Sequence, residues 1–280
     1  MFNFLHTFSP QPIIASLGPI NVYWYGVLMV TSILAALAIT LYLARIYQIN
    51  REQIFDLSFW LIIGGLVGAR IYDVFLQLPY YLRFPGQIIK IWEGGLSIHG
   101  AIIAGLIVLA IWARRYKLNF WKLSALLVPG LALGQAIGRW GNYFNQELFG
   151  LPTTGNIGIP ISLINRPIDY LNYSYFQPTF LYESLGCFII FLILISLIIA
   201  SRRKTDLGTK LYVLITALYM ILYSILRFFL EFIKINQTPT MLGLRWPQII
   251  SLIIIVIFSF ILLTKNHAYQ NQKKQLSEKS

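Results

Sequence analysis

The feature of this sequence that most limits its fold is a series of long apolar segments. An α-helix rises 1.5 Å per residue, so about 20 apolar residues are needed to cross the roughly 30 Å of hydrocarbon in a bilayer. Seven segments meet this requirement, at about residues 20–44, 57–78, 96–113, 123–140, 179–201, 210–232 and 246–264. We expect the fourth to be the shortest. The sequence therefore predicts an all-α membrane protein with seven transmembrane helices.

Composition agrees with this class and argues against others. Hydrophobic residues make up 57% of the chain and charged residues only 11%, which lies outside the range of soluble proteins. The formal net charge is +12, but the lysines and arginines occur in short clusters between apolar segments. A nucleic-acid-binding domain would gather them on one basic surface, so we expect no nucleic-acid partner.

A single cysteine, Cys187, restricts the redox and metal chemistry of the chain. One cysteine makes no internal disulfide, and no partner stands at the spacing of a zinc site or a CxxC motif. We interpret Cys187 as a small apolar residue inside a helix. Neither a metal nor a cofactor is expected.

The basic residues between the segments predict the orientation of the helices, because cytoplasmic connections carry more Lys and Arg than external ones. One alternating set of connections, together with the C-terminal tail, holds fourteen basic residues: Arg45, Arg51, Arg114, Arg115, Lys117, Lys122, Arg202, Arg203, Lys204, Lys210, Lys265, Lys273, Lys274 and Lys279. The other set holds five: Arg83, Lys90, Arg166, Lys234 and Arg245. This bias places the N-terminus outside and the C-terminus in the cytoplasm, with residues 265–280 as a basic cytoplasmic tail.

Seven ionisable side chains fall inside the apolar segments or at their ends: Arg70, Asp73, His99, Arg139, Glu183, Arg227 and Glu231. A charge at membrane depth costs several kcal/mol unless it is paired or hydrated. With the predicted orientation, all seven lie in the outer half of the bilayer. Arg70 and Asp73 are three residues apart on one helix, and we expect them to pair as a structural contact. The whole set, drawn from several helices, predicts a polar chamber that opens toward the outer leaflet.

Two connections on the outer side have a distinct composition. The longest, residues 141–178, is rich in Asn, Gly, Pro and Tyr, and its length exceeds that of an ordinary connector. We expect it to cap the chamber from the periplasmic side. Residues 77–93 mix aromatic residues, prolines and two basic residues, a composition typical of a segment that lies in the membrane interface.

The densest group of polar residues is Gly138 to Gly150, with the sequence GRWGNYFNQELFG, at the outer end of the fourth segment. This run resembles the signature of the prolipoprotein diacylglyceryl transferases, G-R-x-G-N-F-x-N-x-E-x-x-G, with Tyr143 in place of the usual Phe. Further resemblances cover nearly the whole chain: WYG at 24–26, GGLSIHG at 94–100, PTFLYES at 178–184 and RFFLE at 227–231. The chain is therefore similar to this family in five of the predicted helices and in the long connection.

The resemblance implies an enzyme of lipoprotein maturation. Members of this family transfer the diacylglyceryl group of phosphatidylglycerol to the lipobox cysteine thiol of a prolipoprotein, which forms a thioether and releases glycerol 1-phosphate. The expected partners are phosphatidylglycerol, prolipoprotein signal peptides with a lipobox cysteine, and membrane lipids. The expected location is the plasma (inner) membrane, with residues 1–264 as one multi-pass catalytic domain and the active site toward the outer leaflet. The run from Asn165 to Ser184 also resembles cyanobacterial or plastid relatives.

The resemblance also implies two sets of site residues. The catalytic set is Tyr25, His99, Arg139, Asn142 and Glu147. The set that binds phosphatidylglycerol is Arg139, Gly150, Tyr223, Arg227 and Glu231.

The chemistry of the implied reaction gives these side chains their roles. A departing phosphate gains charge, and arginine meets it with a permanently charged, bidentate fork, so Arg139 and Arg227 suit phosphate binding. We expect Glu231 and Glu147 to position the two arginines. His99, the only histidine in an apolar segment, would accept the thiol proton or orient the group that does. A structural hydrogen bond between helices remains an alternative for His99.

Two departures from the family pattern and three other readings bear on this hypothesis. Gln177 and Ala125 stand where many members have His and an acid, so no proton transfer through those two positions operates here. An anion or lipid transporter, or a lipid-binding protein without transferase activity, is the alternative, although the inner halves of the segments are Leu, Ile and Val. A protease dyad of Ser97 and His99 is disfavoured, because residues two apart on a helix point away from each other.

Overall fold

The computed structural model describes residues 2–201, 208–235 and 238–277. The helices are α1 (Phe2–Thr7), α2 (Trp24–Ile46), α3 (Arg51–Leu76), α4 (Leu78–Arg83), η1 (Pro85–Ile89), η2 (Ile91–Glu93), α5 (Ile98–Arg115), α6 (Phe120–Phe144), η3 (Leu163–Asn165), η4 (Ile168–Tyr170), α7 (Thr179–Ser201), α8 (Thr209–Leu230) and α9 (Trp246–Ser277). The strands are β1 (Ile13–Leu17), β2 (Ile20–Tyr23), β3 (Ile159–Pro160), β4 (Tyr175–Phe176), β5 (Thr240–Met241) and β6 (Leu244–Arg245). In the described chain the strands form three antiparallel pairs, β1–β2, β3–β4 and β5–β6, all outside the long helices.

Seven of the described helices are long and apolar enough to cross a membrane, which confirms the predicted number. The first predicted segment began too early. Residues 20–23 form strand β2, which pairs with β1 through a turn at Gly18, and the helix begins only at Trp24. Gly18 has a φ of 62°, a value that glycine adopts without steric cost and that allows this tight reversal.

The fourth spanning helix, α6, differs most from its prediction. It has 25 residues and is not the shortest, because it begins before 123 and continues beyond 140. The side-chain oxygen of Asn119 accepts from the backbone N–H of Trp121 at 2.8 Å, which stabilises the earlier start. At the other end the helix passes through Gly141 and ends at Phe144, so the connection predicted to begin at 141 begins at 145.

The final helix also extends further than expected. The sequence predicts a separate polar tail from residue 265, whereas α9 continues to Ser277. Residues 265–277 contain no Gly or Pro and several good helix formers, so the helix has no local reason to end earlier. Arg202, Arg203, Lys204 and Lys279, which contribute to the predicted orientation, lie outside the described residues.

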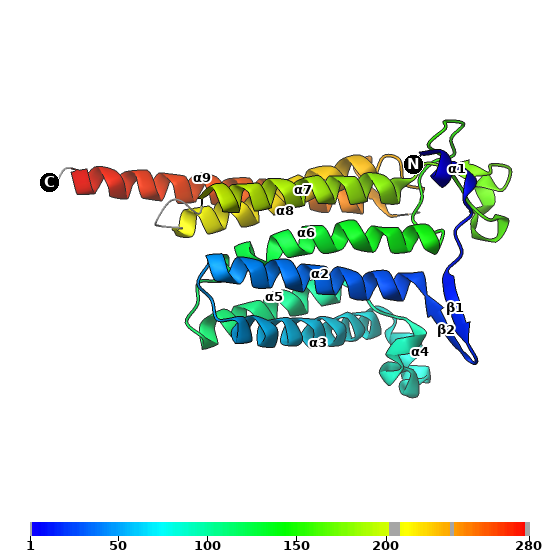
Figure 1. Ribbon diagram of the computed structural model, residues 1–280, viewed down its shortest axis with the longest axis horizontal. Coiled ribbons are helices and arrows are strands. Elements are labelled where there is room, and N and C mark those ends of the chain that lie inside the picture. The colour runs from blue at the N-terminus through cyan, green and yellow to red at the C-terminus, as the bar shows by residue number, and fades with distance from the viewer. Residues whose placement is uncertain (1, 202–207, 236–237, 278–280) are drawn as a thin grey trace. The chain divides into compact units, whose positions relative to one another are not determined.

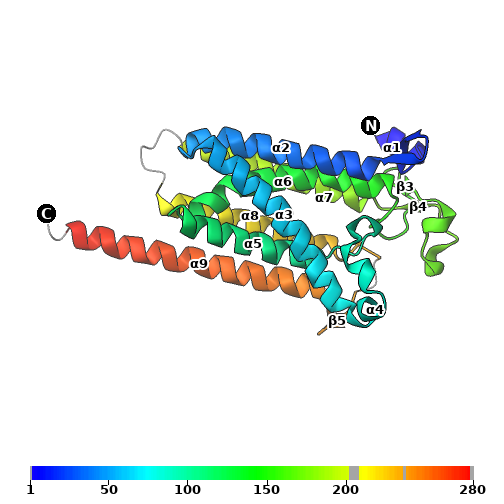
Figure 2. The ribbon, with the colours of Figure 1, turned by 90° about the horizontal axis from the view of Figure 1, so that it is seen from below.

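The chain divides into two compact units, of which unit 2 comprises residues 40–126 and unit 1 the remainder. In unit 2, α3 and α5 pack against each other (Figure 2). Small residues face each other at this contact. A Cβ at Gly100 would overlap the carbonyl of Gly68, and one at Gly64 would lie 2.7 Å from Val108 Cγ2. Close approach of small residues is the usual basis of helix association in membranes.

Arg70 does not pair with Asp73 as the sequence hypothesis expected. Its guanidinium instead donates to five backbone carbonyls of the segment that follows α4, those of Gln87, Ile88, Lys90, Gly94 and Gly95. Asp73 accepts from the Tyr81 hydroxyl at 2.9 Å and from Gln77 at 3.1 Å. The short helices of residues 78–93 leave backbone carbonyls without helical hydrogen-bond partners. The guanidinium of Arg70 has five N–H donors and can bind several of these carbonyls at once, whereas the Asp73 carboxylate one turn away would use fewer of the donors.

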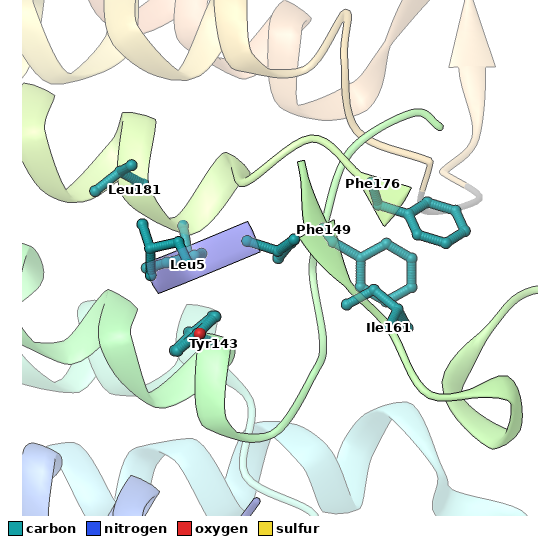
Figure 3. Close-up of a cluster of buried hydrophobic side chains, with 8 residues drawn as sticks. Leu5, Tyr143, Phe149, Ile161, Phe176 and Leu181 are labelled. Atoms are coloured by element: carbon teal, nitrogen blue, oxygen red, sulfur yellow. The ribbon is translucent and has the colours of Figure 1, made fainter. Parts of the chain in front are cut away.

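In unit 1, helices α7, α8 and α9 lie side by side (Figure 1). The connection between α6 and α7, here called the cap (residues 145–178), has its own apolar core. Figure 3 shows this core, which consists of Leu5, Tyr143, Phe149, Ile159, Ile161, Phe176, Phe180 and Leu181. Helix α1 contributes Leu5, and His6 contacts the Gly158 carbonyl at 2.8 Å. The first residues of the chain therefore help to hold the cap in place, which the sequence did not predict.

The contacts of Arg70 lead to a prediction about stability. Arg70→Met should lower the free energy of unfolding by about 3 kcal/mol, because the buried Arg70 side chain donates to five backbone carbonyls that would lose this donor. The midpoint of thermal unfolding, followed by intrinsic tryptophan fluorescence in detergent, measures this effect. Arg83→Met removes an exposed arginine at the end of α4 and serves as the control. Equal midpoints for the two variants would contradict the structural role of Arg70.

Candidate active site

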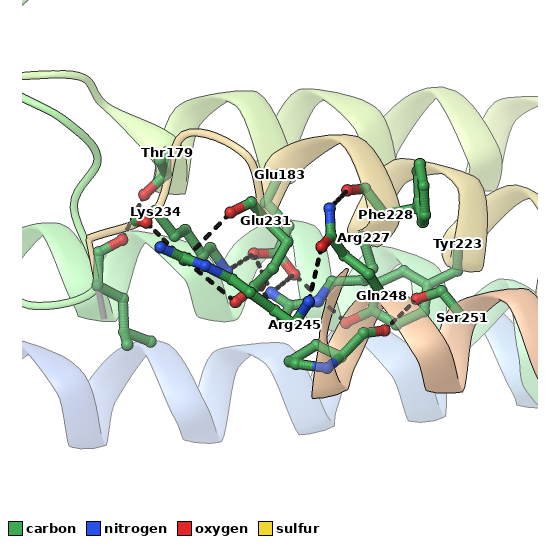
Figure 4. A network of polar contacts seen from close by, with 12 residues as sticks. Thr179, Glu183, Tyr223, Arg227, Phe228, Glu231, Lys234, Arg245, Gln248 and Ser251 are labelled. Atoms are coloured by element: carbon green, nitrogen blue, oxygen red, sulfur yellow. Dashed lines mark hydrogen bonds and ion pairs between the residues drawn. The ribbon is translucent and has the colours of Figure 1, made fainter. Parts of the chain in front are cut away.

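Two arginines from different helices meet at one buried carboxylate, that of Glu183. Arg139 on α6 places Nη2 at 2.8 Å from Glu183 Oε1, and Arg227 on α8 places Nη1 at 3.3 Å from Oε2. The Tyr223 hydroxyl donates to Oε1 at 3.3 Å. Tyr223 and Arg227 are four residues apart and therefore lie on the same face of α8. Figure 4 shows Glu183, Tyr223 and Arg227 of this group, with Glu183 on the first turns of α7.

A second carboxylate, Glu231, lies directly after the last residue of α8, because the helix ends two residues before the end of the predicted segment 210–232. Arg227 Nη2 and Arg245 Nη1 each lie 3.6 Å from its carboxylate oxygens. Arg245 also donates to the backbone carbonyls of Glu231 at 3.2 Å and of Lys234 at 2.6 Å. These bonds hold the connection between α8 and α9 against the end of α8.

Lys234 brings a third cation to Glu183. Its Nζ donates to Glu183 Oε2 at 3.2 Å, and the side chain is almost completely buried. Burial lowers the pKa of the Lys234 ammonium, and the adjacent Glu183 carboxylate opposes that shift. A buried ammonium next to a carboxylate is the arrangement that keeps a lysine charged away from water.

Four cations and two carboxylates make up this arginine network, defined as Arg139, Glu183, Arg227, Glu231, Lys234 and Arg245. It carries a surplus of two positive charges. The two glutamate side chains are only 2% exposed, whereas the three arginines are 22–30% exposed. The carboxylates therefore sit behind the arginines, and the accessible side of the network is cationic. Such a surface attracts anions, phosphate above all.

The signature run at the end of α6 extends the network through the neutral side chain of Asn142 to a third carboxylate, Glu147. Asn142 lies one turn after Arg139 and accepts from it at 3.3 Å, and Asn142 donates in turn to Glu147 at 2.8 Å. The chain leaves the helix sharply, with Gln146 and Leu148 both at positive φ. Glu147 is therefore linked to Arg139 only through Asn142, while Glu183 contacts the arginine directly.

Close packing leaves no room for a side chain at Gly150, or at Gly141 beside Tyr25. Tyr25 lies in the first turn of α2, and a Cβ added to Gly141 would lie 2.7 Å from its ring. Gly150 pairs with Lys234 in a β-bridge, and its N–H donates to the Gln177 carbonyl at 2.9 Å. A Cβ at Gly150 would lie 2.9 Å from the Ile233 carbonyl, so a side chain has no room there.

His99 lies in the first turn of α5, is exposed, and has its ring 6.0 Å from that of Tyr72. It belongs to unit 2, while the arginine network belongs to unit 1. The structure thus brings together six of the nine predicted site residues, Arg139, Asn142, Glu147, Tyr223, Arg227 and Glu231. Gly150 and Tyr25 pack against parts of the same unit.

Three members of the network were absent from the predicted site sets: Glu183, Lys234 and Arg245. The sequence did mark Glu183 as an acid at membrane depth, and this was a usable signal. Lys234 and Arg245 entered the sequence analysis only as basic residues that predict orientation, because a residue in a connection cannot be assigned a membrane depth from the sequence.

One turn from the network, Gln135 Oε1 accepts from the Tyr219 hydroxyl at 3.1 Å and lies 3.8 Å from Cys187 Sγ. Cys187 is fully buried, in agreement with its interpretation as a helix-packing residue.

The two departures from the family pattern have simple surroundings. The backbone N–H of Gln177 donates to the Leu151 carbonyl, and the backbone carbonyl of Gln177 accepts from the N–H of Gly150. Main-chain pairing of this kind does not depend on the side chain. Ala125 is fully buried in α6, where a small apolar residue packs without a polar partner.

Comparison with known proteins gives a consistent result. The family model described as prolipoprotein diacylglyceryl transferase matches residues 12–264. A protein from Nostoc named phosphatidylglycerol–prolipoprotein diacylglyceryl transferase is 42% identical over 253 residues, covering 89% of this chain and 87% of the relative. Proteins of the same name from Synechococcus elongatus and Staphylococcus xylosus are 41% and 35% identical, covering 88% and 94% of this chain and 84% and 92% of their own lengths. The chain belongs to the prolipoprotein diacylglyceryl transferase family.

Proposed function

We propose that this protein transfers the diacylglyceryl group of phosphatidylglycerol to the lipobox cysteine of prolipoproteins, the first step of lipoprotein maturation. The observation that carries the proposal is the pair Arg139 and Arg227, held on one buried carboxylate in a network with surplus positive charge. The names of the relatives supply both substrates. Residues 1–264 act as one membrane-embedded catalytic domain in the inner membrane.

In the proposed step, the cysteine sulfur attacks an sp³ carbon of the diacylglyceryl group. A C–S bond forms, the C–O bond to the phosphate breaks, and its electron pair leaves with glycerol 1-phosphate. The thiol proton passes to a base. The phosphodiester carries one negative charge, and the released monoester carries between one and two at neutral pH. A network with two surplus positive charges stabilises the product of this change more than the starting lipid, which is the requirement for catalysis.

Glu183 has a positioning role in this scheme. Arginines brought together without a carboxylate would repel each other at low dielectric constant. By accepting from both, Glu183 fixes the spacing of their guanidinium groups and leaves their other donors for the lipid phosphate. Asn142, which donates to Glu147, orients Arg139 by accepting from its other terminal nitrogen, Nη1, and Glu231 orients Arg227.

His99 is the proposed base or the group that orients it. Histidine is the side chain whose ordinary charge change falls nearest to neutral pH, and a thiol titrates at about 8.5, so a base helps at physiological pH. The position of His99 at the start of α5 supports the proposal, because α5 begins on the outer side in the predicted orientation. The alternative of a transporter or passive lipid-binding protein predicts no covalent product.

The proposed orientation has the N-terminus and the cap in the periplasm, the C-terminus in the cytoplasm, and the site near the outer leaflet. Two features support it: the charge bias of the connections, and the position of the network at the end of α6 and the start of α7, next to the cap. A translocated prolipoprotein and an outer-leaflet lipid would then reach the same face.

The activity itself is tested with purified protein in detergent, phosphatidylglycerol and a lipobox peptide. Wild-type protein should add one diacylglyceryl unit to the peptide cysteine and release glycerol 1-phosphate, both followed by mass spectrometry. Arg139→Lys and Glu183→Gln should each lower kcat by about 10²- to 10³-fold, because the first removes the fork and the second its spacing. Lipid binding without peptide modification would contradict the function, and full activity of Arg139→Lys would contradict bidentate binding.

The role of His99 is tested by His99→Gln over about pH 6 to 9. We expect kcat/KM to fall at least 100-fold at the lower end of this range and to recover partly as pH rises, because thiolate forms there without a base. His99→Ala serves as a comparison that also removes hydrogen bonding. Retention of most activity by His99→Gln at every pH would rule out the base.

The orientation is tested by cysteine labelling in intact cells. Cys187 is buried, so the wild type should not react and gives the background. Thr154→Cys, on an exposed part of the cap, should react with a membrane-impermeant maleimide, whereas Lys265→Cys should react only after the membrane is permeabilised. The reverse pattern would invert the proposed topology.

A further inference from the structure

Lys234 and Arg245 supply the surplus positive charge of the arginine network, but the proposed transfer step gives neither of them a contact with the lipid. Lys234 and Arg245 both lie in the connection between α8 and α9, outside the spanning helices. Lys234 is bound to Glu183, and Arg245 lies 3.6 Å from Glu231 while it donates to two backbone carbonyls. Either backbone contact could be made by a neutral donor. Two full positive charges at this position are therefore available to act on the lipid headgroup as well.

The positions of Lys234 and Arg245 relative to Arg227 indicate which part of a bound phospholipid they would meet. Arg227 lies in the last turn of α8, whereas Lys234 follows it by seven residues and lies beyond the end of the helix. In Figure 4, Lys234 lies on the side of Thr179, where α7 begins, and Tyr223 lies on the opposite side of Arg227. A phospholipid with its phosphate at Arg227 has its acyl chains among the spans. Its terminal headgroup then lies at the level of Lys234 and Arg245.

The carboxylates of the network offer an incoming headgroup no accessible negative charge that would offset the positive charges of Lys234 and Arg245. Glu183 and Glu231 are each 2% exposed, and each is already faced by at least two cations. An ammonium headgroup would therefore meet positive charges without an accessible carboxylate. A neutral headgroup such as glycerol meets no such repulsion.

We propose that Lys234 and Arg245 are specificity-determining residues that exclude phospholipids with an ammonium headgroup, so that the site accepts anionic phosphodiesters with an uncharged headgroup. The proposal rests on the proposed function, because it requires the lipid phosphate to bind at Arg139 and Arg227. Two unit charges about 8 Å apart at an effective dielectric constant of about 20 change an equilibrium by a factor on the order of ten to thirty. Each cation therefore contributes roughly tenfold to the discrimination.

The experiment compares three donors in the same mixed micelles: phosphatidylglycerol, phosphatidylethanol and phosphatidylethanolamine, with matched acyl chains. The readout is the ratio of kcat/KM values for transfer to a lipobox peptide within one protein preparation, which partial loss of folded protein does not alter. The wild type should use phosphatidylethanol within about threefold of phosphatidylglycerol, and phosphatidylethanolamine at least about thirtyfold less well.

Lys234→Met removes the charge while Glu183 keeps both arginines as partners, and Arg245→Gln removes the charge while a donor remains. Each substitution should reduce the ratio of kcat/KM for phosphatidylglycerol to kcat/KM for phosphatidylethanolamine, here called the gap, about tenfold. Lys234→Arg keeps the charge and should keep the gap. Lys90→Met removes an exposed ammonium that pairs with Glu93 and should also leave the gap unchanged.

Three outcomes separate the explanations. An unchanged gap in both Lys234→Met and Arg245→Gln would overturn the proposal. Wild-type use of phosphatidylethanol that is as poor as that of phosphatidylethanolamine would also overturn it, since selection would then depend on the glycerol hydroxyls. Absence of transfer from phosphatidylglycerol by the wild type would instead reject the proposed function, on which the inference depends.

Discussion

Glu183 holds one negative charge at a point where Arg139, Arg227 and Lys234 converge from three parts of the chain. Buried away from water, none of these cations is stable alone, and together they would repel one another. The carboxylate makes their assembly favourable, and it does so from the first turns of α7, where the helix is fixed by the cap before it and by α8 beside it. The spacing of the arginines thus depends on charge compensation at one residue.

The backbone of the cap reinforces this arrangement. Gly150 bridges to Lys234, Leu151 donates to the Ile233 carbonyl, and Gln177 pairs with Leu151 from the other side. Three stretches of chain that are distant in sequence are therefore joined by main-chain hydrogen bonds next to the arginine network. This explains why glycine is needed at 150, where a side chain has no room, while the residue at 177 is less restricted.

Much of the fold follows from the sequence because a bilayer leaves few alternatives. A backbone in hydrocarbon must satisfy its own hydrogen bonds, so long apolar segments become helices, and their number was predicted correctly. Helix ends were less certain, because they depend on local contacts such as the Asn119 cap of α6. The paired role expected for Arg70 was wrong, since its partners are carbonyls of a segment without helical periodicity. The site residues on helices were identified by their membrane depth and by sequence motifs. Lys234 and Arg245 could not be identified in this way, because they reach the network only through the tertiary structure of the connection between α8 and α9.

The burial of Cys187 has a consequence for an enzyme whose acceptor is a thiol. Cys187 lies one turn from Glu183 on α7, packed beside Gln135 and close to Arg139, for which we propose a role in binding the lipid phosphate. A reactive thiol at that distance from the lipid would compete with the substrate and alkylate the enzyme itself. Because Cys187 is enclosed between helices, we expect that its thiol does not become an acceptor. Protection from self-lipidation is thus a property of helix packing in this fold.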